Sequence, residues 1–173
     1  MTNPDLRCYT INMDYLTCCI IGHRKFNVKE YKEKLISTFE WLITMKNVGI
    51  FLFGSKSEFN HECYQIIREL KRKYPHIKLI YVRAENRYLS NELEASLSFY
   101  YDETYYSYYA EDGGKYSYIL RNEEMIDRSD YCVFYYNKGY LEERKGVIKT
   151  KSGTEMAYNY AKKLRKEVIN VYQ

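Results

Sequence analysis

Short apolar runs alternate with helical stripes along the first half of the chain. The run at 16–21 is short and continuous, which is typical of a strand buried on both faces of a parallel sheet, and 48–53 is a second strand of this kind. Residues 77–82 form a third predicted strand. Between them, apolar residues recur three and four positions apart over 28–42 and 59–70, and this spacing predicts a helix in each interval. Because strand and helix alternate with short turns, we expect right-handed crossovers and a parallel sheet.

The second half of the chain resumes this alternation after an interruption rich in tyrosine. The elements that we predict there are a short helix at 91–97, a helix at 118–127, a strand at 131–136, a helix at 156–166 and a strand at 168–172. We interpret the tyrosine-rich segment 99–109 and the polar segment 137–149 as loops. The pattern predicts one α/β domain over residues 1–173, a Rossmann-like three-layer sandwich with a largely parallel five-stranded sheet and a tyrosine-rich insertion at about 85–117.

Glycine-bearing turns occur where such a sheet would bind a ligand. Gly22 and Gly54 directly follow the first two predicted strands, and Gly153 lies between Ser152 and Thr154 at the start of the last helix. Ligands of open parallel sheets bind beyond the carboxyl ends of the strands, where the winding reverses. A helix capped by Ser152 or Thr154 would direct free N–H groups and the positive end of its dipole at an anion such as a phosphate. The alternative is that Ser-Gly-Thr only caps the helix.

The residues at the ends of the predicted strands and at these turns form one predicted ligand site. Its members are Gly22, His23, Arg24, Gly54, Ser55, Arg83, Arg121, Asn122, Ser152, Gly153, Thr154 and Glu155. We predict no metal site and no cofactor. The turn at 54–57 lacks the Walker spacing, and the Gly-x-Gly-x-x-Gly dinucleotide fingerprint is absent, so ATP hydrolysis is not expected.

Each charged candidate also has a purely structural interpretation. Arg24 would pair with a phosphate in bidentate fashion, or cap a loop. His23 has the weaker case, since a lone histidine is more often a structural hydrogen-bonding group. Arg121 would reach a phosphate or ribose, or lie on a solvated helix face. Glu155 would bind ribose hydroxyls or act as a general acid or base, or would simply be a first-turn glutamate favoured by the helix dipole. Most tyrosines of the insertion are expected to pack, and one or two to stack on a base.

Composition narrows the choice of partner and compartment. The 173 residues include 27 basic and 23 acidic ones, a net charge of +4 that suits a small anion better than nucleic acid. The five cysteines show no metal-ligand spacing, so we expect reduced, buried thiols. No apolar run is long enough to span a bilayer, and residues 1–15 carry no apolar signal core, so a cytoplasmic protein is expected.

From about residue 16 onward the chain resembles the SLOG superfamily, and within it the YpsA-like branch of bacterial and phage proteins. The matching segments are Ile21–Arg24, Phe53–Ser55, Arg121–Tyr131, Lys151–Thr154 with its helix, and the tyrosine-rich Tyr101–Tyr106. The resemblance implies a Rossmann-like domain that binds a nucleotide or a nucleotide-derived signal, of the ADP-ribose or cyclic ADP-ribose type. A role in defence or anti-defence would follow, either by sensing or by sequestering the signal. Relatives commonly pair through helices, so a homodimer is expected.

Two other activities occur among the relatives. LOG enzymes cleave nucleoside 5'-monophosphates and carry Pro-Gly-Gly-x-Gly-Thr-x-x-Glu, whereas here only Ser152-Gly153-Thr154 matches and Glu155 directly follows the threonine. If the chain were a phosphoribohydrolase, Arg121 and Glu155 would be its catalytic residues. The displaced carboxylate favours binding over cleavage. DprA-type relatives bind single-stranded DNA, which the small net charge of this chain does not favour.

Overall fold

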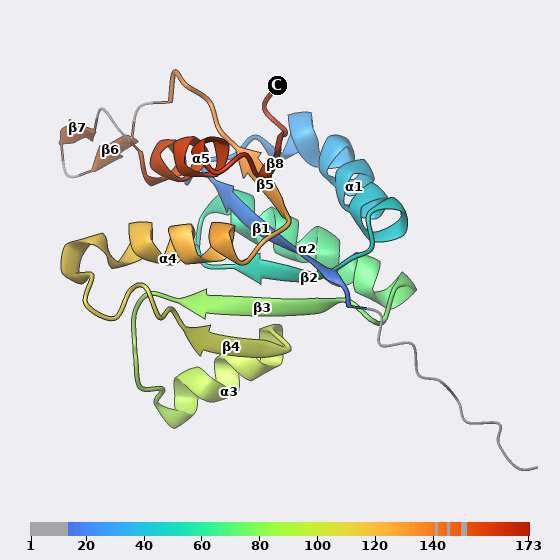
Figure 1. The fold of residues 1–173 in the computed structure, drawn as a ribbon, viewed down its shortest axis with the longest axis horizontal. Helices are drawn as coiled ribbons and strands as arrows, with labels where there is room; N and C mark the ends of the chain where they lie inside the picture. Colours follow the sequence, from blue (N-terminus) through green and yellow to red (C-terminus); the bar gives the residue numbers. More distant parts are fainter. Residues whose placement is uncertain (1–13, 141, 145, 150–151) are drawn as a thin grey trace, which may run out of the picture.

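The computed structural model describes residues 14–140, 142–144, 146–149 and 152–173 (Figure 1). Its helices are α1 (Val28–Met45), α2 (Glu58–Lys73), α3 (Asn91–Tyr100), a short 3-10 helix (Gly114–Tyr116), α4 (Ser117–Asp127) and α5 (Gly153–Lys163). Its strands are β1 (Leu16–Gly22), β2 (Val48–Phe53), β3 (Lys78–Arg83), β4 (Glu103–Tyr106), β5 (Tyr131–Tyr135), β6 (Glu142–Arg144), β7 (Val147–Lys149) and β8 (Glu167–Asn170). Every helix and strand predicted from the apolar pattern is present, with ends shifted by a few residues.

The main sheet has the strand order β4-β3-β2-β1-β5-β8, and every neighbouring pair in it is parallel. The predicted α/β class and parallel sheet are therefore confirmed. The sheet has six strands where five were expected. From β1 the chain adds β2, β3 and β4 on one side, then returns to place β5 and β8 on the other side.

The additional strand is β4, which lies inside the segment that we interpreted as a loop. It pairs with β3, with Tyr105 opposite Val82. Asp102 fixes this register, since its carboxylate accepts a hydrogen bond from the Leu79 N–H at 2.8 Å. The loop interpretation was wrong because tyrosine, a good strand former, builds a half-buried edge strand that contains no apolar run.

The segment at 137–149, also interpreted as a loop, contains a short hairpin. Its strands β6 and β7 pair antiparallel, with Arg144 opposite Val147. The hairpin forms its own two-stranded sheet, and Figure 1 shows it beyond the start of α5, away from the main sheet. Three-residue strands are too short to give a clear alternating pattern, so the sequence did not reveal them.

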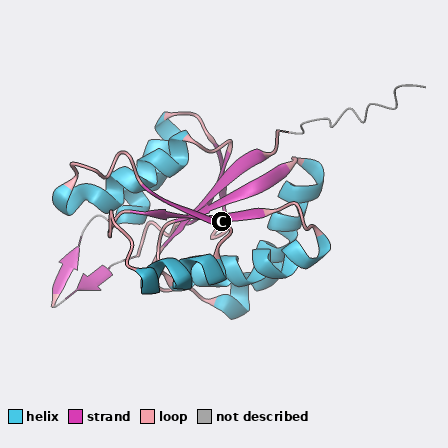
Figure 2. Ribbon diagram, turned by 90° about the horizontal axis from the view of Figure 1, so that it is seen from below, coloured by secondary structure: helices cyan, strands magenta, loops and turns pink. Residues whose placement is uncertain are grey.

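Helices cover both faces of the main sheet. α1 and α2 contact each other and pack on β1 and β2, while α4 and α5 contact each other and pack on β1, β3 and β5 from the opposite face. Figure 2 shows the strands enclosed between these helices. α3 lies beside β4 at the edge of the sheet (Figure 1). The helix–sheet–helix layers explain why the central strands are apolar on both faces.

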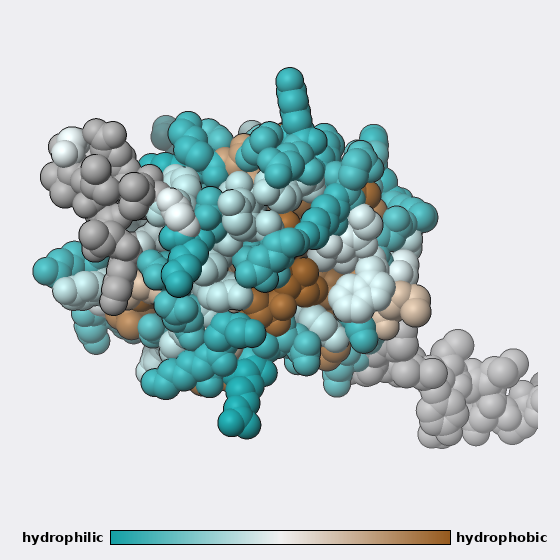
Figure 3. Space-filling view, turned by 90° about the horizontal axis from the view of Figure 1, so that it is seen from above, coloured by the Kyte–Doolittle hydropathy of each residue, from teal (hydrophilic) through white to brown (hydrophobic). Residues whose placement is uncertain are grey.

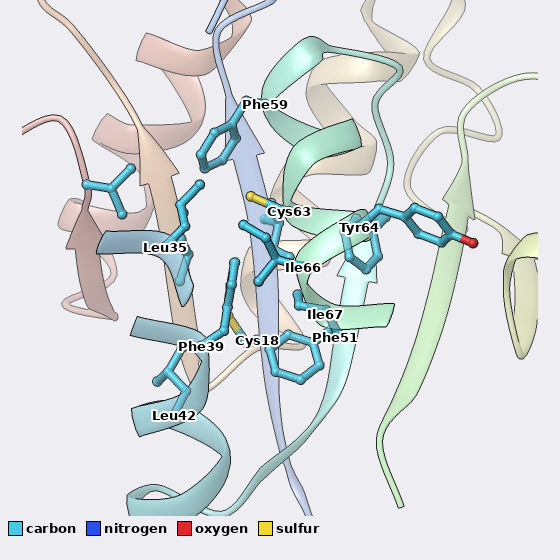
Figure 4. Close-up of a cluster of buried hydrophobic side chains, with 14 of the residues drawn as sticks. Cys18, Leu35, Phe39, Leu42, Phe51, Phe59, Cys63, Tyr64, Ile66 and Ile67 are labelled. Carbon is cyan, nitrogen blue, oxygen red and sulfur yellow. The ribbon is translucent and has the colours of Figure 1, made fainter. Parts of the chain in front are cut away.

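The core is divided by the sheet into two clusters. Along β1, Cys18 and Ile20 face the α1–α2 layer, while Cys19 and Ile21 face the α4–α5 layer. Figure 4 shows the larger cluster, in which Leu35, Phe39 and Leu42 of α1 meet side chains of α2 and the sheet. This alternation is the two-residue period of a strand buried on both faces.

Outside the core the surface is mostly polar. Figure 3 shows one largely hydrophilic face with apolar atoms exposed near its middle. Cys18, Cys19, Cys63 and Cys132 are buried and unpaired, whereas Cys8 lies outside the described residues. In the part of the chain that the structure describes, no helix combines the length and apolarity that crossing a membrane requires.

Candidate functional site

The carboxyl ends of β1 and β5 lie side by side where the winding of the sheet reverses. Gly22 at the end of β1 is opposite Tyr135 at the end of β5, and the His23 N–H donates to the Tyr135 carbonyl at 3.2 Å. β1 leads to β2 on one side, whereas β5 lies on its other side. Helices α4 and α5 begin at this same edge (Figure 1). A switch point of this kind is where open α/β sheets bind ligands.

The start of α5 presents main-chain donors that the protein itself does not use. Ser152 caps the helix, with its hydroxyl accepting the Glu155 N–H at 3.1 Å, and its carbonyl accepts the Met156 N–H. The N–H groups of Gly153 and Thr154 donate to no acceptor in the described residues. Gly153 is exposed, and a Cβ built on it would meet no atom within 4 Å. Two free donors, an open approach and the helix dipole make this position suitable for an anion.

His23 lies beside this edge as a buried, neutral donor. Its side chain is only 2% exposed, and burial lowers its pKa from 6.5 to about 4. Nε2 lies 2.9 Å from the Asn137 nitrogen and 3.2 Å from the Asn137 carbonyl oxygen, and it can bond to only one of them. The shorter contact has room for only the hydrogen of the Asn137 N–H, so Nε2 accepts it and the proton of the neutral ring is assigned to Nδ1. Nδ1 is buried and has no hydrogen-bond partner in the described chain. A buried N–H without an acceptor costs about 1–3 kcal/mol, so a bound group that accepts from it would be stabilised.

The glycines that follow β1 and β2 are explained by packing. A Cβ on Gly22 would lie 2.2 Å from the Phe59 ring, and one on Gly54 would lie 2.7 Å from three side-chain atoms of Arg121. At both positions glycine leaves room for a side chain of the protein. This differs from Gly153, where the space beside the main chain is open.

Arg121 is a buried cation at the ends of β2 and β3. It is 3% exposed, and its Nη1 donates to the carbonyls of Gly54 and Val82, while Nε donates to the Asn122 side chain at 3.0 Å. Burial lowers its pKa to about 10, so it is charged at neutral pH. No carboxylate forms an ion pair with it in the described part of the chain. The hydrogen-bond partners of its guanidinium are therefore neutral oxygens, and Glu85 acts on it only through its charge.

The turn before α2 offers less to a ligand than the start of α5. The Ser57 N–H donates to the Ser55 hydroxyl at 3.1 Å, and the Glu58 N–H donates to the Arg24 carbonyl at 2.9 Å. The Glu58 carboxylate accepts the Phe26 N–H at 3.0 Å. Acceptors within the protein thus take the N–H groups of Ser57 and Glu58, which leaves fewer main-chain donors for a ligand at this turn.

The remaining candidates lie on the same edge in different environments. The Arg24 side chain is exposed, and Glu155 is half-buried in the first turn of α5. Arg83 donates through Nη1 to the carbonyls of Asn86 and Arg87, and its buried Nε has no hydrogen-bond partner among the residues described. Burial lowers the pKa of Arg83.

The insertion is held onto α4 by two carboxylates. Buried Glu124 accepts hydrogen bonds from the Ser107 hydroxyl at 2.5 Å and the Tyr109 N–H at 3.1 Å. Asp127 accepts from the hydroxyls of Tyr109 at 2.8 Å and Tyr160 at 3.0 Å. These contacts support the packing interpretation for this part of the tyrosine-rich segment.

Aromatic rings lie beside the switch point, at positions that we did not select from the sequence. Tyr140 stacks on His23 with ring centroids 4.0 Å apart, and Tyr136 stacks on Tyr158 of α5 at 4.6 Å. Tyr136 is the last residue of the strand predicted at 131–136, and this position was the one signal that the sequence offered. No group of three or more histidine, cysteine or acidic side chains that could hold a metal occurs in the described ranges.

No protein-family model and no curated protein matches this chain. The resemblance to the SLOG superfamily therefore stays a prediction, carried by the quoted motifs.

Proposed function

We propose that this protein binds a nucleotide or nucleotide-derived ligand of the ADP-ribose or cyclic ADP-ribose type at the carboxyl edge of its sheet, with a phosphate at the start of α5. The observation that carries this proposal is the pair of unused N–H groups of Gly153 and Thr154 at the start of an 11-residue helix. The resemblance to the SLOG superfamily supports a nucleotide over other anions.

The neighbouring groups suit a phosphorylated ligand. His23 supplies a neutral donor from its Nδ1, which adds a hydrogen bond without requiring a second buried charge. Arg121 adds positive potential further along the edge, where no described carboxylate forms an ion pair with it. A phosphate oxygen accepts hydrogen bonds from main-chain and ring N–H groups alike.

Binding is favoured over glycosidic cleavage. The electrostatic partners of Arg121 are Tyr81 and Glu85, and no hydrogen bond or ion pair joins it to Glu155 in the described part of the chain. Arg121 donates to the carbonyls of Gly54, which follows β2, and of Val82 in β3, whereas α5 packs on β1 and β5. The two residues that a phosphoribohydrolase would use are therefore not arranged as one catalytic pair.

The test is ligand binding to wild-type protein and to Gly153→Asp. The new carboxylate would occupy the open space at the helix start and repel an anion there, so binding of ADP-ribose, cyclic ADP-ribose isomers or AMP should be lost. Asn159→Asp adds the same charge to an exposed position later in α5 and is the matched control. Calorimetry and thermal melting measure the effect. The proposal fails if none of these ligands binds wild type, or if Gly153→Asp binds as tightly as Asn159→Asp.

Turnover separates a binding protein from an enzyme. Incubating wild type with AMP should release no free adenine, as measured by chromatography. Release that is lost in Glu155→Gln would instead establish the phosphoribohydrolase. Mass spectrometry of small molecules that purify with the protein would identify a ligand that it sequesters or senses.

A further inference from the structure

A series of aromatic rings connects the end of β1 to α5. Tyr140 stacks on His23 at 4.0 Å, His23 lies 5.8 Å from Tyr136, and Tyr136 stacks on Tyr158 at 4.6 Å. The ring of Tyr158 in turn packs edge-on against Phe134 of β5 at 5.4 Å. These contacts bring rings from three parts of the sequence to the switch point.

The main chain that carries two of these rings is held firmly. Tyr136 exchanges hydrogen bonds with the side chain of Asn170 in β8, at 3.0 Å and 2.9 Å. Asn137 donates to His23, and its carbonyl accepts the Tyr140 N–H at 3.0 Å. Its side chain also accepts the Gly139 N–H at 2.8 Å. The turn therefore holds Tyr140 over His23 without the help of a ligand.

Tyr136 lies next to the first turn of α5. Burial and the nearby Glu155 carboxylate both raise the pKa of the Tyr136 phenol. Glu155 is two residues from Gly153, and its N–H is bound by the helix cap Ser152. Tyr136 and Tyr140 are each half-buried, and among the described rings Tyr140 stacks only on His23. One face of the Tyr140 ring is thus packed on His23, and no described ring packs on its other face.

We propose that Tyr140, together with Tyr136, forms the stacking platform for the heteroaromatic base of the ligand, while its phosphate lies on the Gly153 and Thr154 N–H groups. This inference rests on the proposed function and adds the base-binding half of the site. Bases stack on aromatic side chains through their π faces, so the platform would accept different bases with similar strength. It selects nucleotides over sugar phosphates that carry no base.

The tyrosines of the insertion are not placed for this role. β4 and β5 are separated by three strands, which at about 4.8 Å per strand spacing puts them roughly 19 Å apart. Tyr109 is engaged through its hydroxyl with Asp127, whereas Tyr108 is 74% exposed on the insertion. Tyr108 therefore provides a matched control: an accessible tyrosine far from the switch point.

The experiment compares AMP with ribose 5-phosphate, which shares its sugar and phosphate but has no base. Calorimetry should show that wild type binds AMP more tightly, by a factor of about 5 to 150 if one base stacks. Tyr140→Leu should remove most of this gain and leave the affinity for ribose 5-phosphate within about twofold of wild type. Tyr140→Phe keeps the ring and should retain the gain, as should Tyr108→Leu.

Each outcome decides a separate point. If ribose 5-phosphate and AMP bind wild type equally, or if the gain survives in both Tyr140→Leu and Tyr136→Leu, the stacking platform is refuted while phosphate binding stands. If neither ligand binds wild type, the proposed function fails and the platform fails with it. Circular dichroism and melting of Tyr140→Leu show whether the variant is folded. If it is not folded, the comparison is made with Tyr140→Ser and Tyr136→Leu, and an unchanged gain in the folded variant overturns the inference.

Discussion

Lowering the pH from 7 to 5 should destabilise this protein through His23. The imidazole is 2% exposed and has a pKa of about 4 in the folded chain, compared with 6.5 for an ordinary histidine. The folded state therefore binds fewer protons than the unfolded state throughout this pH range. The stability that neutral His23 contributes is fully present above pH 6.5, and it falls as the pH drops through 6.5 towards 4.

The size of the effect follows from the two pKa values. This pKa difference lowers the unfolding free energy by roughly 3 kcal/mol once the pH is below both pKa values. Between pH 7 and pH 5 the loss of unfolding free energy is roughly 2 kcal/mol. Ion-paired carboxylates contribute little in this window. The pKa values of Glu40 and Glu58 lie below their ordinary value of 4.5, lowered by hydrogen bonds from Lys73 and Lys25.

The assay is urea unfolding of wild type and His23→Gln at several pH values from 5 to 7. Glutamine can accept the Asn137 N–H but does not titrate, so the variant should lose most of the pH dependence, whatever its stability at pH 7. His61→Gln replaces an exposed histidine of α2 and should keep the wild-type slope. Parallel pH curves for wild type and His23→Gln would refute the assignment of His23 as a buried neutral base.

Four further substitutions test the packing of the site and of the insertion. Gly54→Ala should cost about 1–3 kcal/mol of unfolding free energy because its Cβ meets Arg121, whereas Gly153→Ala should cost less than about 0.5 kcal/mol in the same urea titration. Arg121→Lys cannot keep both the Nη1 bonds to two carbonyls and the Nε bond to Asn122, so its stability should fall by about 1–3 kcal/mol, and an unchanged melting temperature would contradict this. Ser107→Ala removes a donor to buried Glu124, so hydrogen exchange should accelerate in residues 103–110 and stay unchanged in α1.

The strands that could be predicted from the sequence are those buried on both faces. β1, β2 and β5 have continuous apolar runs because α1 and α2 cover one face and α4 and α5 cover the other. β4 is not covered by helices on both faces in this way, and its sequence pattern is typical of a loop. Its place in the sheet depends on Asp102, which binds the Leu79 N–H and pairs with Lys71 at 2.5 Å. Contacts between segments so far apart in the chain leave no local pattern.

The roles of the three glycines in the candidate site could not be predicted from the sequence either. Gly22, Gly54 and Gly153 look alike in the sequence, each in a turn beside a predicted element. What distinguishes them is the atom that fills the missing side-chain space: Phe59 at Gly22, Arg121 at Gly54, and nothing within 4 Å at Gly153. Only packing in three dimensions separates a glycine required for close packing from one that leaves the main chain accessible.

The carboxyl edge of the sheet therefore divides into two chemically different halves. At β2 and β3 the carbonyls of Gly54 and Val82 already accept hydrogen bonds from the guanidinium of Arg121. At β1 and β5 the donors remain open: the first two N–H groups of α5 and Nδ1 of His23 have no partner in the described chain. A buried donor that lacks an acceptor is costly, and this cost is removed when an acceptor binds. An anionic ligand would thus gain most at the β1–β5 half, and the charge of Arg121 would act on it from the neighbouring half.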